Sequence, residues 1–81
     1  MAHRQSQREN AKTRVISVMW MLSKDRYIQA PEIIRLLEMK FGYRVDRKTI
    51  YDDMRAISRV VPIESKPGNC GGYRLMEFNW E

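Results

Sequence analysis

The polar side chains with the clearest capacity for chemistry gather in one short run of the chain. Arg47 and Lys48 carry donors that match the acceptors on the major-groove edge of guanine, and Thr49 offers a partner for a phosphate or a thymine methyl group. Tyr51 either contacts DNA or packs as a rim residue. Asp52 either accepts from the amino group of cytosine or pairs with Lys48 one helical turn earlier. These residues predict hydrogen bonding to base edges.

Catalysis and metal binding find little support in the composition. His3 is the only histidine, so no histidine-based triad or metal cluster can be assembled. Cys70 stands between Asn69 and Gly71, a setting typical of a turn residue rather than a nucleophile. A single cysteine cannot close an internal disulfide, which favours a reducing compartment. We therefore expect no catalytic residue, no metal and no cofactor, and a protein that is not an enzyme.

The length and charge of the chain limit its class. Its 81 residues suit one domain over 1–81, and the formal net charge of +5 favours a polyanionic partner, either nucleic acid or an anionic membrane. No apolar run approaches the roughly 18 residues that would span a bilayer, and the polar start does not resemble a signal peptide. We expect a cytoplasmic protein, bacterial or phage-encoded, that is associated with the nucleoid.

Three helices are needed to position these side chains. Apolar spacing predicts the first over about 9–24, with one face formed by Val15, Val18, Met19 and Leu22. Ile16 and Trp20 fall on another face, so the middle of this helix is apolar nearly all round. The second helix is predicted from Pro31 to about Lys40, with Gly42 as a left-handed cap, and the third over 47–60 with Asp46 as its N-cap.

A hairpin is predicted after Pro62, with strands over 63–66 and 72–78 around a turn at 67–71. Three helices and a hairpin give a mainly α fold class in the order of a winged helix-turn-helix, with a wing of two or three strands. We expect the helix over 47–60 to enter the major groove of DNA and the wing over 63–78 to lie on the backbone. Residues 1–10 are expected to form a flexible basic arm.

Two segments of the chain resemble a known family. They are Val45-Asp46-Arg47-Lys48-Thr49-Ile50-Tyr51-Asp52-Asp53-Met54, followed by Pro62-Ile63, and Gly71-Gly72-Tyr73-Arg74-Leu75. Together they resemble the helix-turn-helix type 11 domain, which is similar to the DNA-binding end of the deoxyribose-operon-repressor family and of the WYL-domain regulators. The resemblance covers about residues 14–76 and implies a transcriptional regulator. Lys48 and Asp52 stand where the family often has arginine, which implies a shifted sequence preference.

Further basic and amide side chains are candidates for contacts with the DNA backbone. Gln29 stands at the start of the second helix, where backbone N–H groups would anchor a phosphate. The other candidates are Arg4 and Arg8 in the N-terminal arm, Arg44 and Arg55 around the third helix, and Lys66, Asn69 and Arg74 in the hairpin. The two arm residues suit either a DNA groove or a solvated tail. Asp53 lies off the charged face, so we expect it to bond to a neighbouring element.

Apolar side chains beyond the needs of the core suggest a partner. Met76, Phe78 and Trp80 alternate along the C-terminal strand, and with Trp20 they predict the interface of a homodimer. The alternative is that Trp20 and Trp80 fill gaps in a single core. The sequence as a whole predicts sequence-specific binding of double-stranded DNA by a repressor-like regulator, with no small-molecule effector evident. The alternative function is a winged-helix adaptor that binds a protein, such as a phage-encoded one with a host target.

Overall fold

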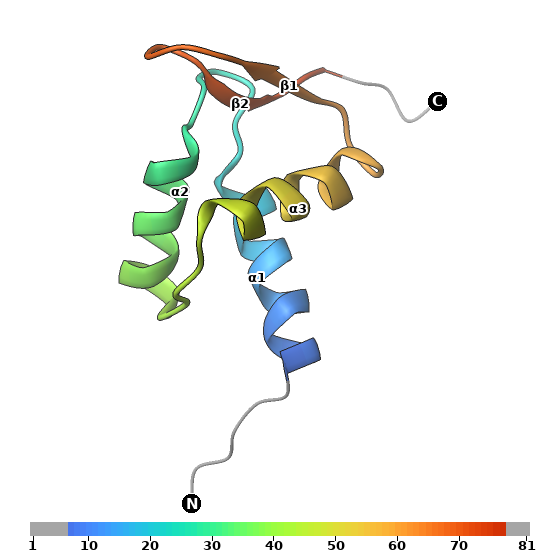
Figure 1. Cartoon of the computed structure of the whole chain (residues 1–81). Helices are drawn as coiled ribbons and strands as arrows, with labels where there is room; N and C mark the ends of the chain where they lie inside the picture. Colours follow the sequence, from blue (N-terminus) through green and yellow to red (C-terminus); the bar gives the residue numbers. More distant parts are fainter. Residues whose placement is uncertain (1–6, 78–81) are drawn as a thin grey trace, which may run out of the picture.

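Three helices precede a two-stranded antiparallel hairpin in the computed structural model, which describes residues 7–77 (Figure 1). The elements are α1 (Gln7–Met21), α2 (Ala30–Leu36), the π-helical turn η1 (Leu37–Phe41) that continues α2, α3 (Arg47–Ser58), β1 (Ile63–Lys66) and β2 (Gly72–Leu75). This is the layout of a winged helix-turn-helix, which confirms the predicted fold class. In Figure 1 the hairpin lies above α3, and α1 comes up from below and passes behind α3.

The first helix is shifted relative to its predicted range of 9–24. It begins at Gln7, so its first turn takes up residues that the sequence assigned to a flexible arm. It ends at Met21 because the Leu22 amide bonds to the Met19 carbonyl in a tighter turn. The Ser23 hydroxyl then accepts from the Asp25 amide, which favours a turn over another turn of helix.

The core lies where the three helices meet. Its largest fully buried side chains come from every one of them: Val18 from α1, Ile33 and Leu37 from α2 and η1, and Ile50 from α3. Burial of each contributes about 1.5–3 kcal/mol to folding. Met19, which the sequence places on the same face as Val18 and Leu22, is 36% exposed because the buried face is centred on those two residues.

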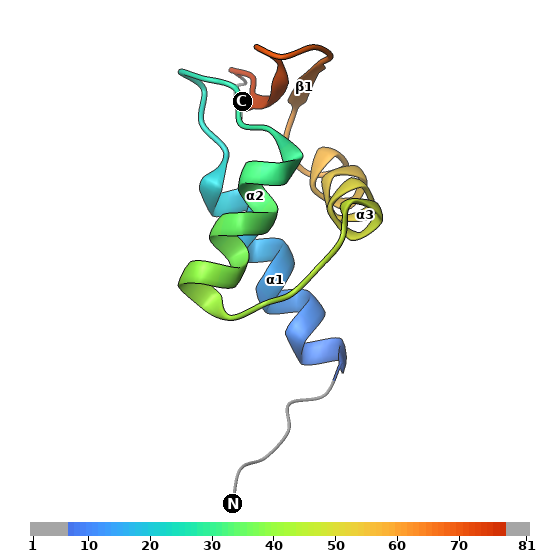
Figure 2. The same ribbon diagram turned by 60° about the vertical axis from the view of Figure 1, so that its left-hand side comes forward.

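The connection from α2 to α3 follows its predicted signals. Pro31 stands in the first turn of α2, and the chain leaves η1 at Gly42, whose φ of 76° is the left-handed conformation that glycine favours. Figure 2 shows this connection running past α1 to reach the start of α3. The turn between two helices that a helix-turn-helix requires is therefore present.

A buried ion pair joins α3 to α1. The Arg14 guanidinium donates to both carboxylate oxygens of Asp53, with Nε–Oδ2 and Nη2–Oδ1 distances of 2.7 and 2.9 Å. The Asp53 side chain is 4% exposed and that of Arg14 is 20% exposed. These hydrogen bonds raise the pKa of Arg14. The predicted structural bond of Asp53 is confirmed, and it fixes how α3 is rotated against α1.

The hairpin is tied to the helices by a third extended segment. The backbone of Ile28 exchanges two hydrogen bonds with that of Tyr73, at 2.9 and 2.8 Å. A Cβ on Gly72 would meet the Ile28 carbonyl oxygen at 2.4 Å, so only glycine fits this approach. Ile28 therefore pairs with β2 as an isolated bridge outside the two-stranded hairpin.

Two element ends were predicted too late in the chain. β2 ends at Leu75, not at residue 78, because Leu75 and Met76 turn their amides to the carbonyls of Ser23 and Pro62 and β1 offers no further residues to pair with. α3 ends at Ser58 rather than at residue 60. Pro62 disfavours helical backbone in the residue before it, and a turn closes there instead.

Replacing Asp53 by alanine is expected to lower the free energy of unfolding by about 3 kcal/mol, because it leaves a largely buried guanidinium without its partner. The matched control is Asp52→Ala at the adjacent exposed position, where we expect a loss of about 0.5 kcal/mol or less. Urea unfolding of both variants measures the difference. Equal losses would show that the buried pair does not hold the helices together.

Candidate nucleic-acid interface

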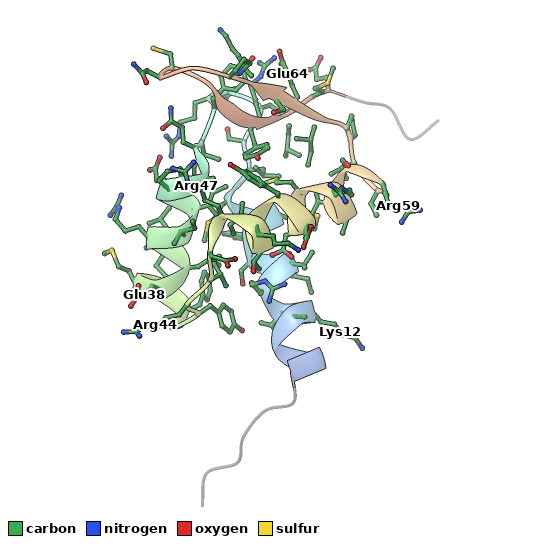
Figure 3. All side chains as sticks on the ribbon, viewed as in Figure 1. Lys12, Glu38, Arg44, Arg47, Arg59 and Glu64 are labelled. Carbon is green, nitrogen blue, oxygen red and sulfur yellow. The ribbon has the colours of Figure 1, made fainter. Side chains whose placement is uncertain are left out.

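Two different surfaces of α3 remain outside the core, since Ile50, Met54 and Ile57 face inward. The first, here called the outer ridge, consists of Lys48, Asp52, Arg55 and Arg59, which are all exposed and follow each other at helical spacing. The second faces the hairpin and contains Arg47 and Tyr51, and Arg55 lies at the border between the two surfaces, where it also lines a hollow below the hairpin. Figure 3 shows Arg47 and Arg59 at opposite ends of the helix.

The outer ridge holds three cations and one carboxylate. The Lys48 ammonium lies 4.0 Å from the Asp52 carboxylate, with 84% and 57% of the two side chains exposed. Such an exposed pair contributes only a few tenths of a kcal/mol, so a ligand can replace it at little cost. Within the described residues, the guanidinium groups of Arg55 and Arg59 form no ion pair. The ridge therefore presents donors and one acceptor to solvent.

The start of α3 is held by its cap. The Asp46 carboxylate accepts from the Thr49 amide at 3.0 Å and from its hydroxyl at 2.8 Å. These hydrogen bonds lower the pKa of Asp46. Asp46 is thus the predicted N-cap. The sequence predicts a DNA contact for the Thr49 hydroxyl. In the structure this hydroxyl donates to Asp46 and helps to hold the start of the helix.

A cleft of about 290 Å³ separates the hairpin side of α3 from the inner face of the hairpin. The residues with polar side chains that line it are Arg47 and Tyr51 from α3, Ser65, Lys66 and Tyr73 from the hairpin, and Gln29 from the start of α2. No carboxylate lines this cleft. Burial, together with the neighbouring Tyr51 phenol, raises the pKa of Tyr73, so the Tyr73 phenol keeps its proton at neutral pH. The cleft is lined by hydrogen-bond donors.

Gln29 closes one end of this cleft. Its side-chain amide donates to the carbonyl oxygens of Gly68 and Asn69 in the hairpin turn. The turn is therefore fixed to the start of α2, and the separation between hairpin and α3 is set before any ligand arrives. The sequence predicts that this residue contacts a phosphate. In the structure its side-chain amide instead holds the hairpin turn.

The outer face of the hairpin carries a separate cluster around the Tyr27 ring. Lys66 and Arg74 lie over this ring, 5.4 and 5.1 Å from its centroid. Arg74 also donates to the Glu64 carboxylate and to the Lys24 carbonyl. Hydrogen bonds from Arg74 lower the pKa of Glu64, and hydrogen bonding to Glu64 raises that of Tyr27.

Arg74, a predicted contact with the DNA backbone, thus lies on the side of the hairpin that faces away from α3. The Lys66 ammonium reaches the same side, while Lys66 also borders the cleft. Ile63 and Ser65 alternate with Glu64 and Lys66 along β1 and point to the inner side. Arg74 is occupied by its own partners, while the Lys66 ammonium lies over Tyr27 and also acts electrostatically on Glu64. Glu64, which Figure 3 shows on the outer side of the hairpin, and Tyr27 were not among the residues singled out from the sequence.

The remaining predicted site residues are scattered. Arg44 pairs with Glu38 at 3.2 Å, at the far end of α2 from the hairpin (Figure 3). Asn69 is exposed in the hairpin turn, and Trp20 and Met76 are 83% and 43% exposed. Outside the described residues lie Arg4, the side chain of Arg8, Phe78 and Trp80. Ser65 and Tyr73 were missed as cleft residues; the two-residue period of the strands is the signal that places them on the inner face.

Comparison with protein-family models, with curated proteins and with solved structures gave no match. Within residues 7–77, no helix is both long and apolar enough to cross a membrane. The same residues contain no group of three or more histidine, cysteine or carboxylate side chains arranged to hold a metal ion.

The Asp46 cap gives stability a defined dependence on pH. Its pKa is lower in the folded chain than the ordinary value of 3.8, so its stabilisation is complete above that value and is lost as the pH falls through the folded pKa. In Asp46→Asn, an amide caps the helix without titrating. We therefore expect the difference in unfolding midpoint between the wild type and this variant to decrease, to the disadvantage of the wild type, when the pH is lowered from neutral to well below 3.8. An unchanged difference would show that the carboxylate does not carry the cap.

Proposed function

We propose that this protein binds double-stranded DNA in a sequence-specific way and acts as a repressor-like transcriptional regulator. The observation that carries the proposal is the outer ridge of α3, whose opposite face is locked into the core. A helix mounted in this way after a helix-turn-helix turn is the element that enters the major groove in DNA-binding proteins of this layout.

The chemistry of the ridge suits base edges. Lys48 donates to the acceptors of guanine, and Asp52 can accept from the amino group of cytosine once its weak pair with Lys48 opens. Arg55 and Arg59 continue the ridge with two more exposed cations. The formal charge of +5 adds a general attraction to the phosphate backbone.

A mobility-shift assay on the DNA around the protein's own gene tests this function, with random-sequence competitor and at two salt concentrations. We expect a shift that resists the competitor and weakens steeply with salt, because phosphate contacts release counterions. Binding of a protein target that is insensitive to salt, without any DNA shift, would favour the adaptor function instead. The sequence assigns that contact to Met76, Phe78 and Trp80, of which Met76 is 43% exposed and the other two lie outside the described residues.

Replacing Lys48 by alanine is expected to cost about 1–3 kcal/mol on the specific site and much less on random DNA, because a base contact is lost. The matched control is Lys12→Ala, an exposed lysine on α1 away from the ridge (Figure 3). Titration of each variant with specific and random duplexes measures the ratio of affinities. Equal losses of Lys48→Ala on both duplexes would remove it from the residues that contact bases.

The same proposal includes a homodimer formed through α1. Ile16, Met19 and Trp20 occupy one outward face of this helix at spacings of three and four residues, and Trp20 is 83% exposed. A second copy that covers this face would remove the largest apolar side chain from water. The operator would then be an inverted repeat, with its spacing set by the dimer.

Light scattering after size exclusion tests the dimer. At micromolar concentration we expect the mass of two chains for the wild type and of one chain for Trp20→Lys, since a charge cannot be buried in an apolar interface. The control is Val60→Lys, another exposed apolar position, after α3 and 69% exposed, which should stay dimeric. A single-chain mass for the wild type, or a dimeric Trp20→Lys, would refute this interface.

A further inference from the structure

The cleft between α3 and the hairpin differs from the outer ridge in chemistry. The ridge mixes three cations with a carboxylate. The residues that line the cleft include two cations, Arg47 and Lys66, with two phenols, a serine hydroxyl, the Gln29 amide and no carboxylate. Such a lining donates hydrogen bonds and offers no charged acceptor. It is suited to an anion rather than to a base edge, which presents donors and acceptors together.

Arg47 is the charged group of this cleft whose position is the most informative. It is exposed, and within the described residues it forms no ion pair or hydrogen bond that would occupy its guanidinium. It lies one helical turn before Tyr51 on the same side of α3. Figure 3 shows it between the upper end of α2 and the hairpin. Its donors are therefore available to a ligand in the cleft.

The position of the cleft between α3 and the hairpin indicates which anion would bind there. If α3 lies in the major groove and the hairpin lies over the adjoining minor groove, one sugar–phosphate strand must pass between α3 and the hairpin. The reason is that such a strand separates the two grooves. The gap between α3 and the hairpin is this cleft. Gln29 and the backbone pairing of Ile28 with Tyr73 hold its far wall in place, so the gap is formed in the free protein.

We propose that this cleft holds a phosphodiester group of the DNA backbone, gripped by Arg47 with Tyr51 as a second donor. The proposal rests on the DNA-binding function above and deepens it. It changes the role that the sequence assigned to these two residues, from contacts with bases to contacts with the strand between the grooves. Lys48 and Asp52 then remain as the principal base-contacting pair of α3.

The test combines variants of the protein with DNA that carries a neutral methylphosphonate at one linkage at a time. With the wild type, neutralising the linkage in the cleft should lower affinity about tenfold, the scale of a hydrogen bond to a charged group. Arg47→Ala should lose a similar factor on specific and random duplexes. The slope of log affinity against log salt should fall by about 0.9, the value for one phosphate contact. For Arg47→Ala, the methylphosphonate at that linkage should cost nothing more.

Two further variants separate this role from others. Tyr51→Phe keeps the ring and should lose a few-fold in affinity with an unchanged salt slope, because no charge is removed. Arg35→Ala, an exposed arginine on α2, is the matched control and should change neither affinity nor slope.

Distinct results would overturn the proposal. If the wild type binds duplex DNA but Arg47→Ala weakens only the specific site, with the salt slope unchanged, Arg47 contacts a base and the cleft proposal fails alone. The cleft proposal also fails alone if the affinity losses from Arg47→Ala and from the methylphosphonate simply add at every linkage. If inorganic phosphate perturbs the NMR signals of Tyr51 and Tyr73 while no linkage couples to Arg47, the cleft takes a free phosphate instead. If the wild type binds no duplex at all, the DNA-binding function itself fails.

Discussion

The geometry of this small protein depends on one point, where side chains from three helices pack against each other. Val18, Ile33, Leu37 and Ile50 are each removed from water there, and no second core is present in the described residues to replace them. A core of this size leaves the rotation of α3 loosely determined, since apolar contact is non-directional. The directional bond between Arg14 and Asp53 supplies what the core lacks. Together with the buried stripe of Ile50, Met54 and Ile57, it determines which residues of α3 face outward, and so places the ridge.

The hairpin is positioned by backbone and amide contacts rather than by a core of its own. Pairing of Ile28 with Tyr73 and the Gln29 amide attach it at its base and at its turn. Two surfaces of different chemistry result on either side of it. The inner side forms the donor-lined cleft with α3, and the outer side is closed by Tyr27 with its two cations and Glu64.

Much of the fold follows from local signals in the sequence. Asp46, Gly42 and the apolar stripe of Ile50, Met54 and Ile57 fix the ends and the inner face of the helices, and the structure confirms them. The ends that were misjudged, at Met21 and Leu75, depend on hydrogen bonds to distant or neighbouring backbone that no periodicity reveals. The candidate site was less accessible for the same reason. Spacing along α3 finds its charged side, but it does not tell that Arg47 lies across from Ser65 and Tyr73, or that Thr49 and Arg74 are occupied.

The way in which Gln29 holds the hairpin turn has a consequence for how this protein can vary. It binds the carbonyl oxygens of Gly68 and Asn69, groups that every amino acid carries. The exposed side chains of Asn69 and Cys70 take no part in that attachment. These two side chains can therefore be replaced while the attachment of the turn by Gln29 stays the same. Related chains could change their binding preferences at this turn without a change of fold.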